Sequence, residues 1–140
     1  MDGRGEGEID VRRLFWVGPT TVAVSVLAVW IVQQIILAML PALPPFSASV
    51  LNSNEPAMAT AILVSAGVLT FPIVADASSN PLRSFRRFAL GVLLVSCMPN
   101  VIGPLIGRGI DLGMLALMVL HIVAWAITVT MLTRLTVIRK

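Results

Sequence analysis

Charged residues and cysteines are both scarce in this chain of 140 residues. Only 12% of the residues are Asp, Glu, Lys or Arg, whereas 57% are hydrophobic. A soluble domain usually carries about 25% charged residues, so this balance excludes a disordered chain, a coiled coil and a water-soluble globular domain. A single cysteine excludes an intramolecular disulfide and a zinc site built from cysteines. The composition therefore indicates an integral membrane protein.

The chain also lacks the residue sets on which most enzymes and cofactor proteins depend. The sequence has no nucleotide-binding glycine loop, no CxxC pair, no cluster of metal ligands and no lysine inside an apolar segment. A Ser/His/Asp set with a buried carboxylate and a carboxylate pair for general acid–base catalysis are missing too. These absences favour a non-enzymatic protein without a metal site, although they leave an enzyme open.

Four apolar segments are each long enough to cross a membrane. About 20 helical residues span a hydrocarbon core of about 30 Å. The sequence predicts an all-α, antiparallel bundle of four transmembrane helices at about 14–40, 56–75, 88–107 and 112–133. The first segment is too long for the core of a signal peptide, so we expect it to be retained. Residues 1–13 are expected to form a mobile N-terminal segment and residues 134–140 a basic tail.

The basic residues predict the orientation of the bundle. Nine of the ten Lys and Arg residues precede the first segment, lie between the second and third, or follow the fourth. Short cytoplasmic loops carry an excess of such residues, so both termini are predicted to be cytoplasmic. The same charges would face anionic lipid headgroups, which explains the high pI without nucleic acid as a partner.

Eight side chains within the apolar segments form the candidate ligand-binding site. Polar groups in lipid cost free energy, so they normally face other helices or a cavity. The polar candidates would lie about 9–16 Å from the outer ends of their helices, and the two tryptophans are too deep for an interfacial belt. We expect His121 to lie within one or two side chains of Asn100 and Ser96, with Gln33 or Gln34 lining the same space. The full set is Gln33, Gln34, Ser65, Ser96, Asn100, His121, Trp30 and Trp125.

His121 is the one histidine of the chain and the one titratable base in the apolar interior. Three roles are open: a neutral side chain with one hydrogen bond, a ligand-binding or proton-relay group, and a haem ligand. Haem needs a second axial ligand, for which the chain offers methionines, or a second His121 across a dimer. The cofactor therefore stays unknown, with haem or a pigment as the candidates.

Two classes of function follow from these residues. The first is a non-enzymatic protein that holds a lipophilic ligand or takes part in the assembly of a membrane complex. The second is a small carrier or membrane enzyme that uses His121 as its titratable group. Four helices are few for a transport pathway, so a carrier would need a dimer. Small residues in the second and third segments allow close helix contacts, and we expect a homodimer or a subunit of a larger complex.

Two short motifs carry a resemblance to a known group of proteins. The third segment contains Ser96-x-x-Pro99-Asn100, and the fourth contains Met118-x-x-His121-x-x-Ala124. This pattern resembles an uncharacterised family of small bacterial four-helix membrane proteins, over residues 86–133. The resemblance implies the four-helix topology and the bacterial inner membrane, and it implies no activity. Family members often have an aspartate where this chain has Asn100, so a proton relay is not implied.

Overall fold

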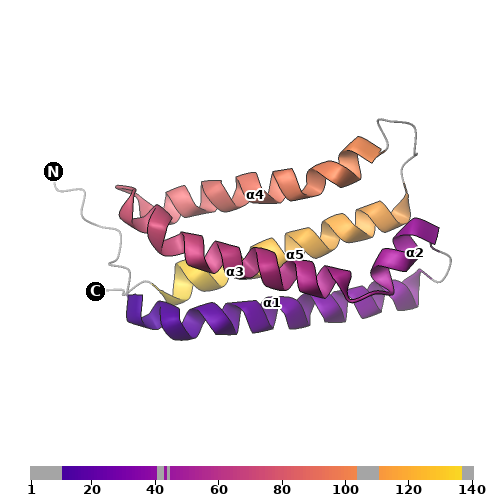
Figure 1. The fold of residues 1–140 in the computed structure, drawn as a ribbon, viewed down its shortest axis with the longest axis horizontal. Coiled ribbons are helices and arrows are strands. Elements are labelled where there is room, and N and C mark those ends of the chain that lie inside the picture. The colour runs from indigo at the N-terminus through magenta and orange to yellow at the C-terminus, as the bar shows by residue number, and fades with distance from the viewer. Residues whose placement is uncertain (1–10, 41–42, 44, 104–110, 137–140) are drawn as a thin grey trace.

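The computed structural model of the chain describes residues 11–40, 43, 45–103 and 111–136. These residues form five helices and no strand: α1 (Val11–Met39), α2 (Pro45–Leu51), α3 (Glu55–Asp76), α4 (Pro81–Gly103) and α5 (Leu112–Leu135). All except the short α2 are long and apolar enough to cross a membrane, and they run side by side (Figure 1). The predicted all-α four-helix bundle is confirmed, and the chain is a small polytopic membrane protein.

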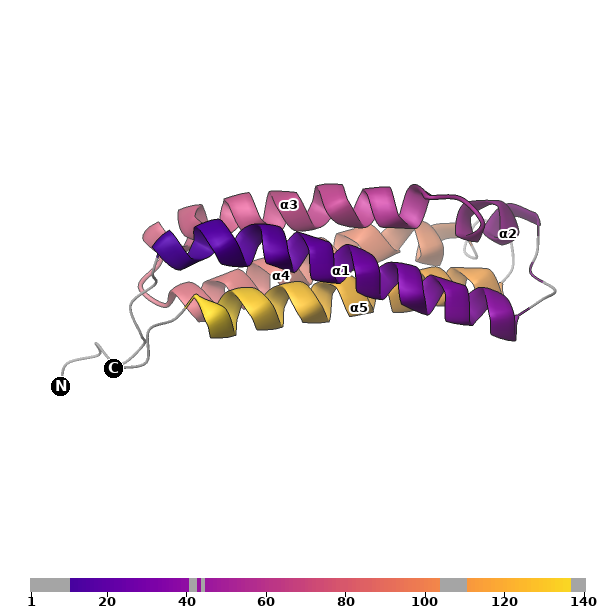
Figure 2. The same cartoon turned by 90° about the horizontal axis from the view of Figure 1, so that it is seen from below.

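Neighbouring long helices run in opposite directions along the bundle. Helix α1 packs along both α3 and α5, whereas α4 packs mainly against α5 and less extensively against α3 (Figures 1 and 2). The start of α1, the α3–α4 turn and the end of α5 all lie at one end, which we call the basic end. It carries the arginines Arg12, Arg13, Arg83, Arg86, Arg87 and Arg134. Helix α2 lies at the opposite end.

Helix α4 begins earlier than the third apolar segment of the sequence. Pro81 occupies its start, where the missing N–H costs nothing and the fixed φ favours a helix. Arg83, Arg86 and Arg87 therefore lie on the first two turns of α4 and not in a connecting loop. The apolar segment locates the part of a helix that matches the hydrocarbon core, whereas the helix itself continues into the headgroup region. The end of the predicted third segment, residues 104–107, lies outside the described residues.

Two separate apolar clusters hold the bundle together. At the basic end, Phe71, Phe85, Val129 and Leu132 join α3, α4 and α5. The second cluster lies toward the opposite end and contains residues of α1, α2 and α5, with none from α4: Val29, Leu51, Ala116 and Leu120, with Val32, Ile36, Leu37, Leu43, Leu117, Val123 and Ala124 against them. Within the described residues, α4 is thus joined to the core at its N-terminal end, and its C-terminal half lies outside both clusters.

A polar junction joins α2 to the start of α5. Asp111 caps α5, because one carboxylate oxygen accepts a hydrogen bond from the Gly113 N–H at 2.6 Å. The Ser47 hydroxyl of α2 donates to the other carboxylate oxygen, also at 2.6 Å. Ser47 and Gly113 are both buried, so the α5 backbone approaches α2 closely at this point.

Candidate functional site

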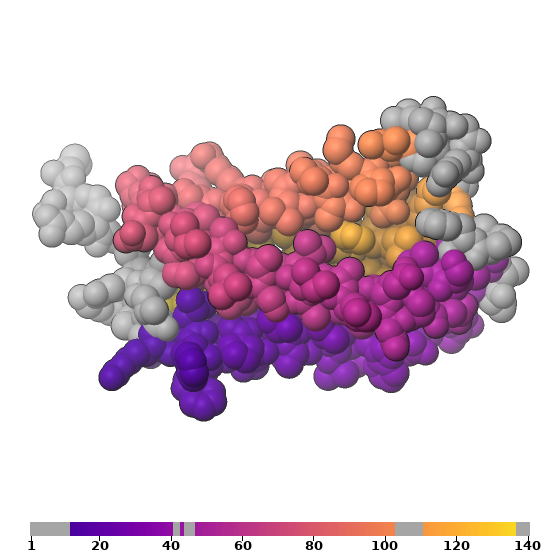
Figure 3. Space-filling model, viewed as in Figure 1, coloured from indigo at the N-terminus to yellow at the C-terminus, as the bar shows by residue number. Residues whose placement is uncertain are grey.

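A cleft of about 410 Å³ lies between α3 and α4, with α5 as its floor. Figure 3 shows the hollow, where atoms of α5 are visible between the two other helices. Most lining residues are apolar, and several on the rim are also exposed at the surface of the bundle: Leu63, Phe88 and Val92. The cleft therefore opens sideways, toward the position that lipid occupies. Its volume falls in the range of about 300–1,000 Å³ that is typical of small-molecule sites.

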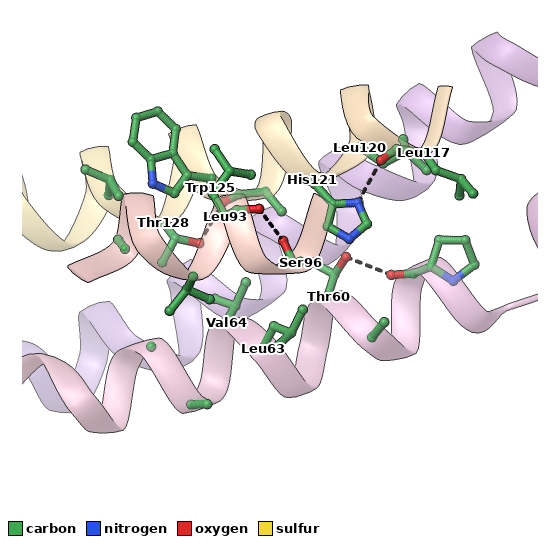
Figure 4. Close-up of a pocket in the computed structure, with 18 of the residues that line it drawn as sticks. Thr60, Leu63, Val64, Leu93, Ser96, Leu117, Leu120, His121, Trp125 and Thr128 are labelled. Carbon is green, nitrogen blue, oxygen red and sulfur yellow. Dashed lines mark hydrogen bonds between the residues drawn. The ribbon is translucent and has the colours of Figure 1, made fainter. Parts of the chain in front are cut away.

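Three helices each contribute polar side chains to this cleft. Thr60 comes from α3, Ser96 and Asn100 from α4, and His121 from α5. In Figure 4 the imidazole of His121 extends from α5 toward Thr60. The structure thus brings together His121, Asn100 and Ser96, as their shared depth predicts. Trp125 also lines the cleft, one turn from His121.

The hydrogen bond of His121 determines which ring nitrogen is available. Its Nδ1 lies 2.7 Å from the backbone oxygen of Leu117, one turn earlier in α5. A carbonyl oxygen only accepts hydrogen bonds, so Nδ1 carries the proton in the neutral ring. Nε2 is then an unprotonated acceptor, and in Figure 4 it is the ring nitrogen on the side of Thr60.

The hydroxyl groups of Thr60 and Ser96 in the cleft both donate their protons to backbone oxygens. Thr60 donates to the Pro56 oxygen at 2.7 Å, and Ser96 donates to the Leu93 oxygen at 2.9 Å. Each hydroxyl oxygen keeps lone pairs but has no second proton to give. Together with His121 Nε2, the polar part of the cleft is therefore rich in acceptors. The side-chain amide of Asn100 is the one group among these four that offers free donors.

Four of the predicted site residues lie elsewhere, so the expectation of a space shared with Gln33 or Gln34 does not hold. None of Gln33, Gln34, Ser65 and Trp30 lines the cleft. Gln34 and Trp30 are exposed on α1, and Ser65 is half-buried on α3. Equal depth is a one-dimensional criterion: α1 contributes no residue to the lining of the cleft, and rotation about the α3 axis leaves Ser65 outside that lining.

Gln33 has a structural partner in place of a ligand. It is 3% exposed, and its Nε2 donates to the Leu51 oxygen at 2.6 Å and to the Ser53 oxygen at 3.1 Å. Leu51 is the last residue of α2 and Ser53 lies in the connection to α3, so both acceptors are where the helical hydrogen-bond pattern ends. Gln33 thus fixes α1 to this connection by satisfying carbonyl groups that have left the helix.

We expect Gln33→Leu to destabilise the protein by about 1–3 kcal/mol, because it removes the donor from two carbonyl groups, one of them at the fully buried Leu51. The matched control is Gln34→Leu, which replaces an exposed neighbour on the same helix and should leave stability unchanged or raise it in lipid. Unfolding in mixed micelles, followed by circular dichroism, measures both variants. Equal effects of the two substitutions would contradict the role of Gln33.

Four polar residues of the cleft were not among the sequence candidates. Thr60, Thr70 and Thr128 line it, as does Glu55 at the start of α3. Threonine is common in membrane helices, where it bonds to its own backbone, so a threonine alone gives no signal of a site. The spacing of His121, Trp125 and Thr128 along one face of α5 was the available signal.

No match to known proteins assigns this site a chemistry. Among the described residues, no group of three or more His, Cys, Asp or Glu side chains could hold a metal ion. The single cysteine, Cys97, is buried on α4 and does not line the cleft. No protein-family model, curated protein or solved structure matches the chain. The resemblance to the bacterial four-helix family therefore stays a prediction.

Proposed function

We propose that this protein binds a lipophilic molecule that carries a hydrogen-bond donor, such as a long-chain alcohol, in the cleft between α3, α4 and α5. The observation that carries the proposal is the separation of the C-terminal half of α4 from the core, which leaves an apolar cleft with acceptors from three helices. The apolar chain of the ligand would contact the walls, such as Leu63 and Val92. Its hydroxyl group would donate to His121 Nε2.

The location and assembly of the protein belong to the same proposal. The arginines at the basic end favour a cytoplasmic position for that end, in the inner membrane of a bacterium. A homodimer or a larger complex would use faces other than the cleft. Exposed apolar side chains on α1 and α3, such as Trp16, Leu27, Leu69 and Ile73, are available to lipid or to a second protein.

The test uses a photoreactive probe, hexadecanol with a diazirine in its chain, and its O-methyl ether as the matched probe without a donor. We expect the alcohol to label cleft residues in proteoliposomes and the ether to label them about fivefold less, because one hydrogen bond is worth about 1 kcal/mol. His121→Ala should lower alcohol labelling by the same factor, and Asn100→Ala should lower it similarly if both share one site. Peptide mass spectrometry locates and quantifies the label.

Gln34→Ala is the control for this test, since Gln34 is a polar residue outside the cleft. It should label as the unmodified protein does. His121→Leu should unfold at a similar denaturant concentration, because the hydrogen bond of His121 is to the Leu117 oxygen of its own helix. Even interhelical hydrogen bonds in membranes average only about 0.6 kcal/mol. Equal labelling by alcohol and ether, or equal labelling of the cleft and of exposed residues such as Leu69, would refute the proposal.

A further inference from the structure

A second cavity, of about 430 Å³, lies between α4 and α5 at the basic end. Four arginines line it: Arg83, Arg86, Arg87 and Arg134. The remaining lining residues are Leu90, Trp125, Val129, Thr130 and Thr133, so none of the described residues contributes a carboxylate to the cavity. Four like charges around one space repel one another unless an anion lies between them.

The helix that carries three of these arginines adds to their unfavourable energy. Arg83, Arg86 and Arg87 lie on the first two turns of α4, and its first turn contains no acidic residue. The N-terminal end of a helix carries a partial positive charge, which disfavours cations there and favours anions. The fourth arginine, Arg134, lies in the last turn of α5, where a cation is favourable. A phosphate group would therefore be stabilised by both the arginines and the start of α4.

A buried donor without an acceptor borders the same cavity. The Nε1 atom of Trp125 is inaccessible to solvent and has no hydrogen-bond partner among the described residues. In Figure 4 the indole of Trp125 points away from His121. A buried N–H without an acceptor costs free energy. Because water does not reach Nε1, the indole contributes its apolar ring, and not this donor, to the lining of the cavity.

We propose that this cavity binds the phosphate group of an anionic phospholipid, with its acyl chains along α4 and α5. The residues beside the arginines fit such a molecule, because Leu90, Trp125 and Val129 continue the cavity as an apolar surface toward the middle of the bundle. A free phosphate ion would use the arginines alone and leave this apolar part without a partner. The arginine guanidinium groups suit phosphate oxygens, since each presents a planar set of donors.

The site is independent of the ligand cleft proposed above. The cleft lies on the α3 side of α4. None of its charged residues, hydroxyl residues, Asn100 or His121 lines the basic cavity. The two cavities share only Trp125 and Val129. Failure of one proposal therefore leaves the other standing.

Quenching of Trp125 fluorescence by brominated lipids tests the proposal directly. Trp16 and Trp30 are exposed toward lipid and would also be quenched, so both are replaced by phenylalanine in the full-length protein. Vesicles of phosphatidylcholine then contain about 10% of either dibrominated phosphatidylglycerol or dibrominated phosphatidylcholine, at one ionic strength. We expect several times more quenching by the anionic lipid, because it would be concentrated at the cavity beyond its share of the bilayer.

Charge-removing variants distinguish this site from a general attraction to the basic end. Arg86→Gln with Arg134→Gln removes one cavity arginine from each helix. It should weaken binding of the anionic lipid about 30-fold, from about 1 kcal/mol per basic residue and about 1.4 kcal/mol per factor of ten, and so remove the excess quenching by that lipid. Arg12→Gln with Arg13→Gln removes the same charge at the same end, outside the cavity, and should leave most of the preference intact.

Three results would overturn the proposal. In the protein that keeps all its arginines, equal quenching by the two brominated lipids would exclude a site selective for anionic lipid. Equal effects of the two double variants would assign the preference to diffuse surface charge. Loss of anionic-lipid quenching in about 10 mM inorganic phosphate, at constant ionic strength, would assign the site to free phosphate, whereas persistence of the quenching supports a bound lipid.

Discussion

Phe85→Ala is expected to lower the free energy of unfolding by about 3 kcal/mol, one of the two largest effects of a single substitution that we predict for this protein. Phe85 is 1% exposed and meets the fully buried Phe71 edge-to-face, with ring centroids 4.7 Å apart. Replacing a buried phenylalanine in a soluble core costs about 3–5 kcal/mol. The lower end applies here, because lipid is itself apolar and only the packing is lost.

Because of the location of this pair, Phe85→Ala should affect the whole of α4 and not only the contact between the two rings. Phe85 lies in the one apolar cluster that includes α4, near its N-terminal end. Its loss should therefore loosen the whole of α4 and raise the rate of hydrogen exchange along that helix. Phe88→Ala is the matched control, since Phe88 lies one turn further along α4 and is 44% exposed. It should cost less than about 1 kcal/mol.

A double-mutant cycle with Phe71→Ala separates the ring contact from the loss of volume. The coupling energy expected for an edge-to-face pair is about 0.5–1.5 kcal/mol. Denaturant titration of the four proteins in mixed micelles supplies the values. An effect of Phe85→Ala no larger than that of Phe88→Ala would show that α4 is not held by this cluster.

Gly113→Ala is expected to destabilise the protein by about 1–3 kcal/mol, which is the cost of forcing extra volume into a packed region. A methyl group on Gly113 would overlap the Cβ and Oγ atoms of Ser47, which is fully buried on α2. Because the overlap involves a Cβ atom, no side-chain rotation relieves it, and α2 must shift relative to α5. That shift would also break the hydrogen bond from Ser47 to Asp111.

Gly91→Ala is the control for this prediction. A Cβ atom at Gly91 meets no atom within 4 Å, and the residue lies within α4. Alanine favours a helix over glycine by up to about 1 kcal/mol, so this variant should be as stable as the original or slightly more so. Thermal unfolding in detergent, with circular dichroism as the readout, compares the two. Equal stability of Gly113→Ala and Gly91→Ala would mean that α2 does not pack on α5 as described.

The four long helices follow from the sequence because a membrane imposes a simple rule on it. Every backbone polar group must be satisfied within the segment, so a sufficiently long apolar run has helix as its main solution. Helices of about 20 residues, and the turns that separate them, can therefore be predicted from the sequence without tertiary information. The first residue of α4 could not be predicted in this way, because Arg83, Arg86 and Arg87 mark the edge of the hydrocarbon core and not the edge of the helix.

Part of the candidate site could be predicted from the sequence, for a geometric reason. Depth along a helix is proportional to residue number, so His121, Asn100 and Ser96 could be placed at similar levels and do line one cleft. Rotation about the helix axis depends on which face of each helix packs against its neighbours. The long helices carry apolar residues nearly all round, as the exposed Leu63, Leu69 and Ile73 of α3 illustrate, and so give no such face.

By itself, the sequence determined the class of this protein, its four spans and the few polar side chains within them, because the cost of polar groups in lipid acts on each segment separately. Only the tertiary structure decided which of these side chains meet. It turned Gln33 toward the carbonyl groups of Leu51 and Ser53, and it turned His121 toward Thr60. It also separated α4 from α3 to form the cleft. These outcomes depend on packing between helices, which sums many small contacts that no single segment encodes.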